Sequence, residues 1–193
     1  MDRLSTLIAL ALAAFPGCDK SQDAGPLPSR AESGKVGSAQ QASTDAFCDV
    51  HKRDDSGPLF QVPAVGEVKV LGPAHGNWLW LNVWATWCKP CVEEMPRIAR
   101  WREKLGHVDV AFVSIDETDA DVAAFQQAHP DAPRTARLAD PKAQSDWFKQ
   151  LGLDGNPPIP IHVFVSPTGH VRCARAGGVR EQDYAAIEKL LAE

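Results

Sequence analysis

The chain has 193 residues, which is enough for one domain of about 140 to 150 residues and additional segments. Its 44% of hydrophobic residues is ordinary for a protein with a packed core. A net charge of −5, from 20 basic and 25 acidic residues, gives no indication of the clustered basic face that nucleic-acid binding requires. We therefore expect no nucleic-acid partner.

Residues 1–17 have the pattern of an export signal, with Arg3 followed by an uncharged and mostly apolar run over residues 4–15. This run is too short to cross a hydrocarbon core of about 30 Å comfortably, which makes a permanent transmembrane helix the weaker interpretation. Gly17-Cys18 follows, and a small residue before a cysteine resembles a bacterial lipoprotein cleavage site. We therefore expect Cys18 to be lipidated, with an ordinary secreted protein or an uncleaved anchor as alternatives. All three interpretations place the rest of the chain outside the cytoplasm.

The segment 18–45 contains Ser, Gln, Gly, Pro, Ala and charged residues, and almost no large apolar side chains. Such a composition cannot bury enough surface to offset the entropy lost on ordering, so we expect a flexible tether rather than a folded subdomain. The pattern changes near Phe47, and we expect the folded domain to occupy residues 46–193.

Within this domain the hydrophobic pattern alternates between strand and helix periods. Short apolar runs broken by Pro and Gly over 58–70 predict a leading β-hairpin. Continuous apolar runs predict buried strands at 78–84 and 108–115, and a turn at 167–169 joins two more strands. The predicted strands are 78–84, 108–115, 161–165 and 171–176, and the predicted helices are 91–105, 119–128, 143–151 and 181–192. A β-α-β unit requires parallel strands, so we predict a mixed sheet flanked by helices.

The five cysteines are an odd number, which needs explanation in an exported protein. Lipidation of Cys18 accounts for one, and Cys88 and Cys91 form an adjacent pair. Cys48 and Cys173 remain, and an oxidising compartment favours a structural disulfide between them. Free buried thiols or a second relay pair are the alternatives.

Cys88 and Cys91 are three positions apart where a predicted strand meets a helix, as dithiol exchange requires. The exposed N–H groups and the positive end of the helix dipole stabilise a thiolate at the first cysteine. Cys88 is therefore the expected nucleophile and Cys91 the resolving thiol, with Pro90 suited to the first helical turn. Half of a zinc site is the competing interpretation, but the sequence has no second CxxC or Cys/His pair at finger spacing.

The run NVWATWCKPCVEEMP over residues 82–96 resembles the thioredoxin-fold reductases of the TlpA/ResA type, and the resemblance extends from about residue 60 to residue 191. It implies an α/β thioredoxin fold, a central mixed sheet flanked by helices, here with an N-terminal hairpin extension. Asn82 stands where cytoplasmic thioredoxins carry a buried aspartate, which favours the exported branch. Pro96 corresponds to the helix-kinking proline.

The same resemblance assigns roles to residues around the pair. Glu94 corresponds to an active-site glutamate, and its position on the helix face of Cys91 makes it a candidate acceptor of the Cys91 proton; a solvated glutamate is the alternative. Pro160 corresponds to a cis-proline facing the pair, with Pro158 as the alternative, and the backbone of Ile159 would then contact substrate. The other expected substrate contacts come from Trp87, Lys89 and Pro90. His162 takes a position where relatives often carry Thr.

These features predict an extracytoplasmic, membrane-anchored thiol–disulfide oxidoreductase that reduces selected protein disulfides and needs no cofactor besides its own Cys88–Cys91 disulfide. The resemblance implies electrons from a transmembrane thiol carrier, and partners such as apocytochrome c or copper-site assembly factors. The alternative is a copper-binding module that uses Cys88, Cys91 and His162, although such modules usually have three residues between the cysteines. A peroxidase is less consistent with the adjacent Cys91.

Overall fold

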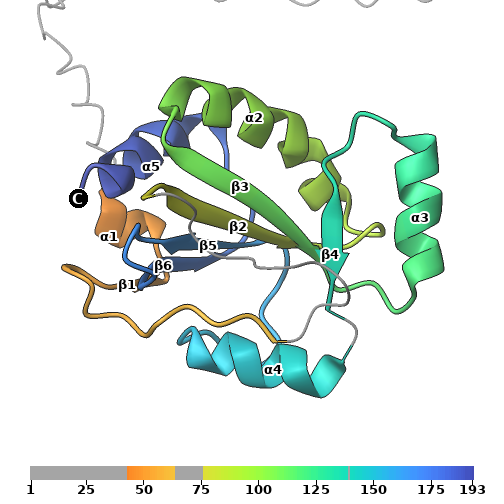
Figure 1. Cartoon of the computed structure of the whole chain (residues 1–193), viewed down its shortest axis with the longest axis horizontal. Helices are drawn as coiled ribbons and strands as arrows, with labels where there is room; N and C mark the ends of the chain where they lie inside the picture. Colours follow the sequence, from red (N-terminus) through yellow and green to blue (C-terminus); the bar gives the residue numbers. More distant parts are fainter. Residues whose placement is uncertain (1–42, 64–75, 139) are drawn as a thin grey trace, which may run out of the picture. The chain divides into compact units, whose positions relative to one another are not determined.

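The structure is a computed structural model that describes residues 43–63, 76–138 and 140–193. Its sheet has the strand order β1-β6-β5-β2-β3-β4 (Figure 1). The strands are β1 (Val50–His51), β2 (Trp78–Trp84), β3 (Val108–Ser114), β4 (Thr135–Arg137), β5 (Ile161–Val165) and β6 (Val171–Ala176). β2, β3 and β4 are parallel, whereas β5 runs antiparallel to β2, and β6 antiparallel to β5.

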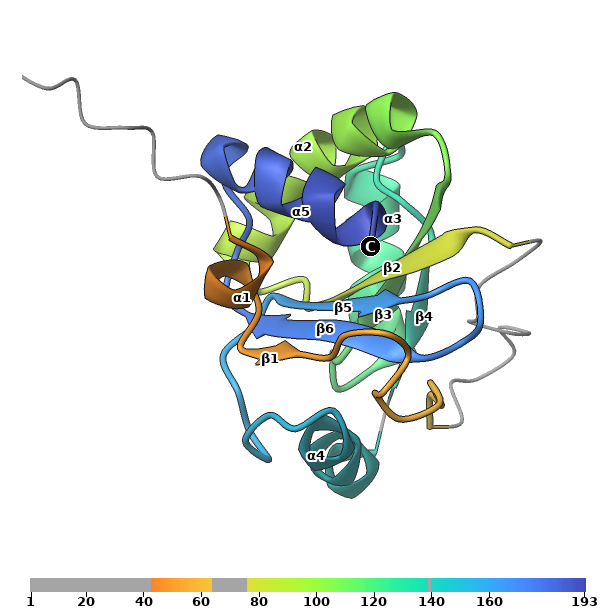
Figure 2. The same ribbon diagram turned by 90° about the vertical axis from the view of Figure 1, so that its left-hand side faces the viewer.

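The helices are α1 (Thr44–Phe47), α2 (Lys89–Leu105), α3 (Asp119–Ala128), α4 (Pro141–Gln150), the 3-10 turn η1 (Glu181–Asp183) and α5 (Tyr184–Leu191). α2 connects the parallel strands β2 and β3, and β5 and β6 form an antiparallel hairpin. α2 and α5 cover one face of the sheet and α4 covers the other (Figure 2). This arrangement is a thioredoxin-like fold, as the sequence predicts.

The strand alternation separates two hydrophobic clusters. Trp80 and Trp84 lie in the cluster that includes the buried side of α2, and Trp80 packs with Phe164. Leu81 and Val163 lie in the other cluster, with Trp147 and Phe148 of α4. All seven residues of β2 are buried, since both faces of this central strand are covered.

The predicted strands and helices 78–84, 119–128, 161–165 and 171–176 have the observed bounds, and the other boundaries move by a few residues. The predicted single helix 181–192 is divided into η1 and α5. The sequence prediction did not contain α1, β1 or β4. α1 begins at Thr44, two residues before the predicted start of the domain.

The predicted N-terminal hairpin lies only partly within the described residues. Over 58–63 a single bridge pairs Leu59 with His170, and residues 64–70 lie outside the described part of the chain. The hairpin therefore stays a prediction. The predicted export signal, Cys18 and nearly all of the predicted tether also lie outside the described residues.

Candidate active site

The Cys88–Cys91 disulfide lies at the junction of β2 and α2, with a Cα–Cα distance of 5.3 Å. Cys88 is the N-cap of α2, and its Sγ accepts a hydrogen bond of 3.3 Å from the backbone N–H of Cys91. Cys88 is 5% exposed and Cys91 is completely buried. The first cysteine therefore lies at the positive end of the helix, and the second lies behind it.

The surface around Cys88 is formed by residues that the sequence had indicated as substrate contacts. Trp87 is 68% exposed although it is a large hydrophobic residue, and Lys89 and Pro90 are exposed at the first turn of α2. Lys89 forms an ion pair with Glu93, which lies on the solvent side of the helix. A large apolar indole is usually buried, so the exposure of Trp87 next to the cysteine pair is unusual.

The segment before β5 faces the cysteine pair. The Ile159–Pro160 peptide bond is cis, and the carbonyl oxygen of Ile159 lies 3.9 Å from Cys88 Sγ. Pro160 is buried and its own carbonyl accepts from the N–H of Gly177, whereas Pro158 is exposed. The structure thus has the cis bond at Pro160 and not at Pro158.

Glu94 is only 2% exposed and is not a solvated helix residue. Its Oε1 accepts a hydrogen bond of 2.8 Å from Asn82 Nδ2, and its Oε2 accepts one of 2.9 Å from the N–H of Val179. The imidazole Nε2 of His162 lies 3.4 Å from Oε1. Asn82 and His162 are neighbours in the β2–β5 register, so the sheet and α2 together form this buried polar cluster.

Gly178 links the Glu94 carboxylate to the cis-proline. A Cβ at Gly178 would meet Glu94 Oε2 at 3.2 Å and the Pro160 ring at 3.7 Å. The carboxylate and Pro160 therefore flank the same point of the backbone, and a side chain at Gly178 would require the carboxylate to shift by a few tenths of an ångström. Neither Gly178 nor Val179 is among the residues that the sequence indicates.

A second buried carboxylate holds the loop that precedes Cys88. Asp116 is 1% exposed and accepts hydrogen bonds from the backbone N–H and the hydroxyl of Thr86, and from the hydroxyl of Ser114. Thr86 is two residues before Cys88, so Asp116 fixes the loop from the end of β3. This contact joins positions 30 residues apart, so no local sequence pattern indicates it.

Cys48 and Cys173 form a second disulfide, with a Cα–Cα distance of 5.6 Å. It joins the residue after α1 to the central part of β6, where Cys173 is completely buried. This bond therefore attaches the first described segment of the chain to the sheet, beside the pairing of β1 with β6.

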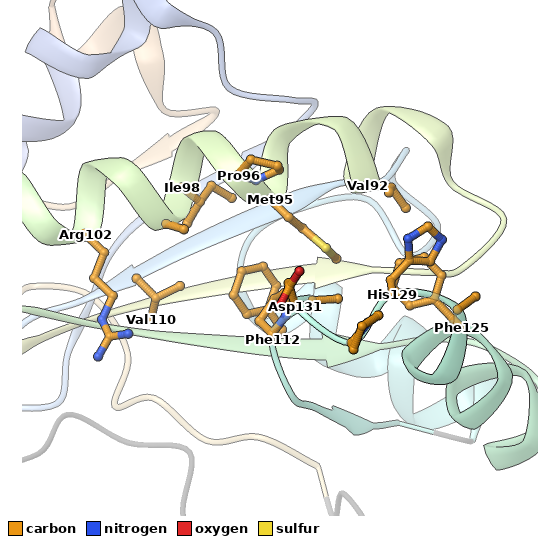
Figure 3. A pocket seen from close by; sticks show the side chains of 15 residues that line it. Val92, Met95, Pro96, Ile98, Arg102, Val110, Phe112, Phe125, His129 and Asp131 are labelled. Atoms are coloured by element: carbon orange, nitrogen blue, oxygen red, sulfur yellow. The ribbon is translucent and has the colours of Figure 1, made fainter.

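A pocket of about 550 Å³ lies along the flank of α2 (Figure 3). Val92, which directly follows Cys91, and Arg102 lie at opposite ends of the pocket in this view. Its other lining residues are mostly apolar and come from α2, β3, α3 and the loop over 129–133.

Comparisons with known proteins assign the chain to a family. It belongs to the AhpC/TSA family, whose sequence model matches residues 54–174. It is 40% identical over 68 residues to the thioredoxin-like protein YneN of Bacillus subtilis, and the match covers 33% of this chain and 40% of YneN. It is 29% identical over 131 residues to the thiol-disulfide oxidoreductase ResA of Oceanobacillus iheyensis, covering 63% of this chain and 64% of that protein. The chain thus spans less than two thirds of the length of these relatives.

Among solved structures, the chain is similar to a thioredoxin-related protein from Neisseria meningitidis serogroup B. The sequences are 26% identical, the match covers 67% of this chain and 91% of the other, and the TM-score is 0.49. The assignment of the fold rests on the sheet order and the β2-α2-β3 unit, not on this likeness.

Within the described ranges, no helix has the length and apolar character needed to cross a membrane. The same residues contain no group of three or more His, Cys, Asp and Glu side chains arranged to hold a metal ion.

Proposed function

We propose that the chain is an extracytoplasmic thiol–disulfide oxidoreductase that reduces selected protein disulfides. The observation that carries this proposal is the arrangement of Cys88 at the helix N-terminus, opposite the Ile159 carbonyl, with Cys91 buried behind it. A thiolate that attacks a protein disulfide needs an accessible approach and electrostatic stabilisation. Cys88 lies at the helix N-terminus and is the only cysteine of the pair with any exposed surface, at 5%, whereas the resolving Cys91 is completely buried.

In the proposed reaction, the Cys88 thiolate of the reduced protein attacks one sulfur of the substrate disulfide. A mixed disulfide forms and the other substrate sulfur leaves as a thiolate. Glu94 then accepts the proton of the Cys91 thiol, and the Cys91 thiolate attacks Cys88 Sγ. The second substrate thiolate leaves, so the substrate gains two electrons and the protein ends with the Cys88–Cys91 disulfide. This chemistry uses no cofactor besides the cysteine pair.

The substrate is proposed to bind as an extended peptide beside the cis bond, with its backbone against Ile159. Trp87 supports this proposal, because its exposed indole offers apolar contact area next to Cys88. Lys89 and Pro90 border the same surface and complete the expected contacts.

The location and the electron supply are further parts of the proposal. The apolar run over 4–15 and the Gly17-Cys18 pair support export and lipid anchoring through Cys18. A periplasmic protein anchored in this way would receive electrons from a transmembrane thiol carrier. Cytochrome c maturation is one process that needs such a reductant.

The copper-binding alternative requires His162 to act as a ligand together with the two cysteines. Its imidazole is completely buried, Nδ1 accepts from the indole of Trp80 at 3.1 Å, and Nε2 faces Glu94. Both ring nitrogens are therefore directed at other side chains, which favours the redox proposal.

The proposal is tested by trapping partners with the Cys91→Ala variant, expressed in the exported form. Without the resolving thiol, mixed disulfides should accumulate on Cys88, and the matched Cys88→Ala variant should trap none. If neither variant traps a protein, and the wild type binds one Cu(I) tightly, the copper-binding alternative replaces the proposal.

The direction of electron flow is tested by the reduction potential of the Cys88–Cys91 couple. A reductant should have a potential near that of thioredoxin, about −270 mV. A value near about −120 mV, typical of a strong oxidant, would contradict the reductase proposal while leaving thiol–disulfide exchange intact.

A further inference from the structure

His162 lies at the centre of the buried cluster behind the cysteine pair, and its hydrogen bonds define its protonation pattern. The indole N–H of Trp80 can only donate, and it lies 3.1 Å from His162 Nδ1. Nδ1 must therefore be an acceptor without a proton, so the neutral ring carries its proton on Nε2. That nitrogen faces Glu94 Oε1 at 3.4 Å and has no hydrogen-bond partner of good geometry among the described residues.

Charged groups also lie near the ring. Arg175 stands beside His162 in the β5–β6 register. Its guanidinium donates to the carbonyl of Phe47 and stacks over the Phe47 ring. On the α2 side, the titratable and charged groups are Glu94, the Cys88–Cys91 pair and Arg97, which donates to the carbonyl of Val179.

The orientation of Asn82 follows from the same network. Its Nδ2 donates to Glu94 Oε1, and the flipped amide would place Oδ1 against the carboxylate. The Glu94 carboxylate accepts hydrogen bonds from the Asn82 amide and from the Val179 N–H, and His162 Nε2 approaches its Oε1 to 3.4 Å. These contacts fix the orientation of the carboxylate within the buried cluster.

We propose that His162 is a positioning residue: it is held as the Nε2–H tautomer by Trp80, and its N–H keeps the Glu94 carboxylate ready to accept the Cys91 proton. This inference rests on the proposed function, because it assigns a purpose to the buried cluster in the resolving step. In that step the proton leaves Cys91 Sγ for a Glu94 oxygen, and the electron pair of Cys91 forms the bond to Cys88. His162 keeps its own proton throughout.

The tautomer is tested by long-range ¹H–¹⁵N NMR correlations of the ring nitrogens in the full wild-type chain. The expected signature at neutral pH is an unprotonated Nδ1 and a protonated Nε2. Trp80→Phe should convert this signature to a mixture of tautomers, because the fixing hydrogen bond is lost. A protonated Nδ1 in the wild type would overturn the proposal, and this measurement requires no variant to fold.

The effect on the resolving step is tested by rapid-quench measurement of the mixed disulfide over a range of pH. His162→Leu removes the donor, and should slow release of the mixed disulfide about tenfold, whereas attack by Cys88 keeps its rate. His162→Gln places an amide N–H near the position of Nε2 and should restore release to within about threefold of the wild type. Equal slowing of both steps, or of neither, would overturn the role of His162. Failure of the wild type to form any mixed disulfide would instead overturn the proposed function.

Discussion

At the scale of single residues, the geometry around Cys88 depends on buried polar groups that do not react. The carboxylate of Asp116 accepts hydrogen bonds from both the backbone N–H and the hydroxyl of Thr86. Removing one partner from a buried hydrogen bond costs about 1–3 kcal/mol, because the remaining group loses its partner without regaining water. The loop that presents Cys88 is therefore fixed from the end of β3.

This contact gives a prediction for Thr86. Thr86→Val keeps the shape of the side chain but removes the hydroxyl, so the free energy of unfolding should fall by about 1 kcal/mol or more. Thr86→Ser is the matched control, since it keeps the hydroxyl and should retain most of that free energy. Urea denaturation measures both variants, and equal stabilities would show that Asp116 does not hold the loop through this hydroxyl.

The carboxyl group of Asp45 gives a prediction about pH. Its pKa is lowered from 3.8, mainly by the hydrogen bond with His51 and further by the charge of Arg53. A carboxyl whose pKa is lower in the folded state stabilises the fold above the unfolded value, and this contribution is lost as the pH falls below it. Stability should therefore decrease between about pH 4 and about pH 2, and Asp45→Asn should make that decrease smaller. Denaturation curves over this range measure the difference, and an unchanged pH dependence would contradict the role of His51.

The residues that sequence reasoning found are those that belong to a contiguous motif. Cys88, Cys91 and Glu94 lie within a few positions of one another, and Pro160 is implied by the family resemblance, which expects a cis-proline at a set distance before the turn at 167–169. Asp116 and Gly178 were missed because their contacts cross between elements that are far apart in the sequence. A pattern along one strand or helix carries no signal for such contacts.

At the scale of elements, helix starts are fixed by their caps. α3 begins with a capping box, in which the hydroxyl of Thr118 accepts from the N–H of Asp121 while the Asp121 carboxylate accepts from the N–H of Thr118. Such a cap satisfies N–H groups that have no partner within the helix.

Replacement of this cap should measurably weaken α3. Thr118→Ala is expected to lower the free energy of unfolding by about 1 kcal/mol, because the first turn loses its acceptor. Thr118→Ser keeps the hydroxyl and should lie close to the wild type. Thermal or urea unfolding provides the measurement, and a fully stable alanine variant would argue against a contribution from the capping box.

The elements that could be predicted are the ones with strong internal patterns. β2 is a run of seven buried residues and β5 a run of five, and all but Asn82 and His162 are hydrophobic, so the hydrophobic pattern indicates their bounds. β1 and β4 have two and three residues, which is too short for a hydrophobic pattern to be recognised in the sequence. β1 pairs with β6 and β4 pairs with β3 at the two edges of the sheet. These backbone hydrogen bonds form only after the neighbouring strands have folded, so the short sequences do not indicate them.

At the scale of the whole molecule, the Cys48–Cys173 disulfide closes a loop with a sequence separation of 125 residues. In the chain-entropy account, such a bond restricts the unfolded chain and thereby adds about 4 to 5 kcal/mol to the free energy of unfolding. The bond attaches the segment with α1 and β1 to the sheet. Because the loop that it closes includes most of the described residues, its loss should lower the stability of the whole domain.

The double variant Cys48→Ala/Cys173→Ala should therefore lose about 4 to 5 kcal/mol of the free energy of unfolding. The matched control Cys88→Ala/Cys91→Ala removes a disulfide that closes a very short loop, and should lose only about 1 to 2 kcal/mol. Urea denaturation under non-reducing conditions compares the two. A larger loss in the control would contradict a structural role for Cys48–Cys173.

The central claim is that Cys88 attacks and Cys91 resolves, and the reaction of the reduced protein with an aromatic disulfide tests it most directly. In the wild type, both halves of the reagent should be released as thiolate and Cys88–Cys91 should be recovered as a disulfide. In Cys91→Ala, only one half should be released, and mass spectrometry should locate the other half on Cys88. A stable adduct on Cys91 in Cys88→Ala at the same rate, or a stable adduct on the wild type, would contradict the account.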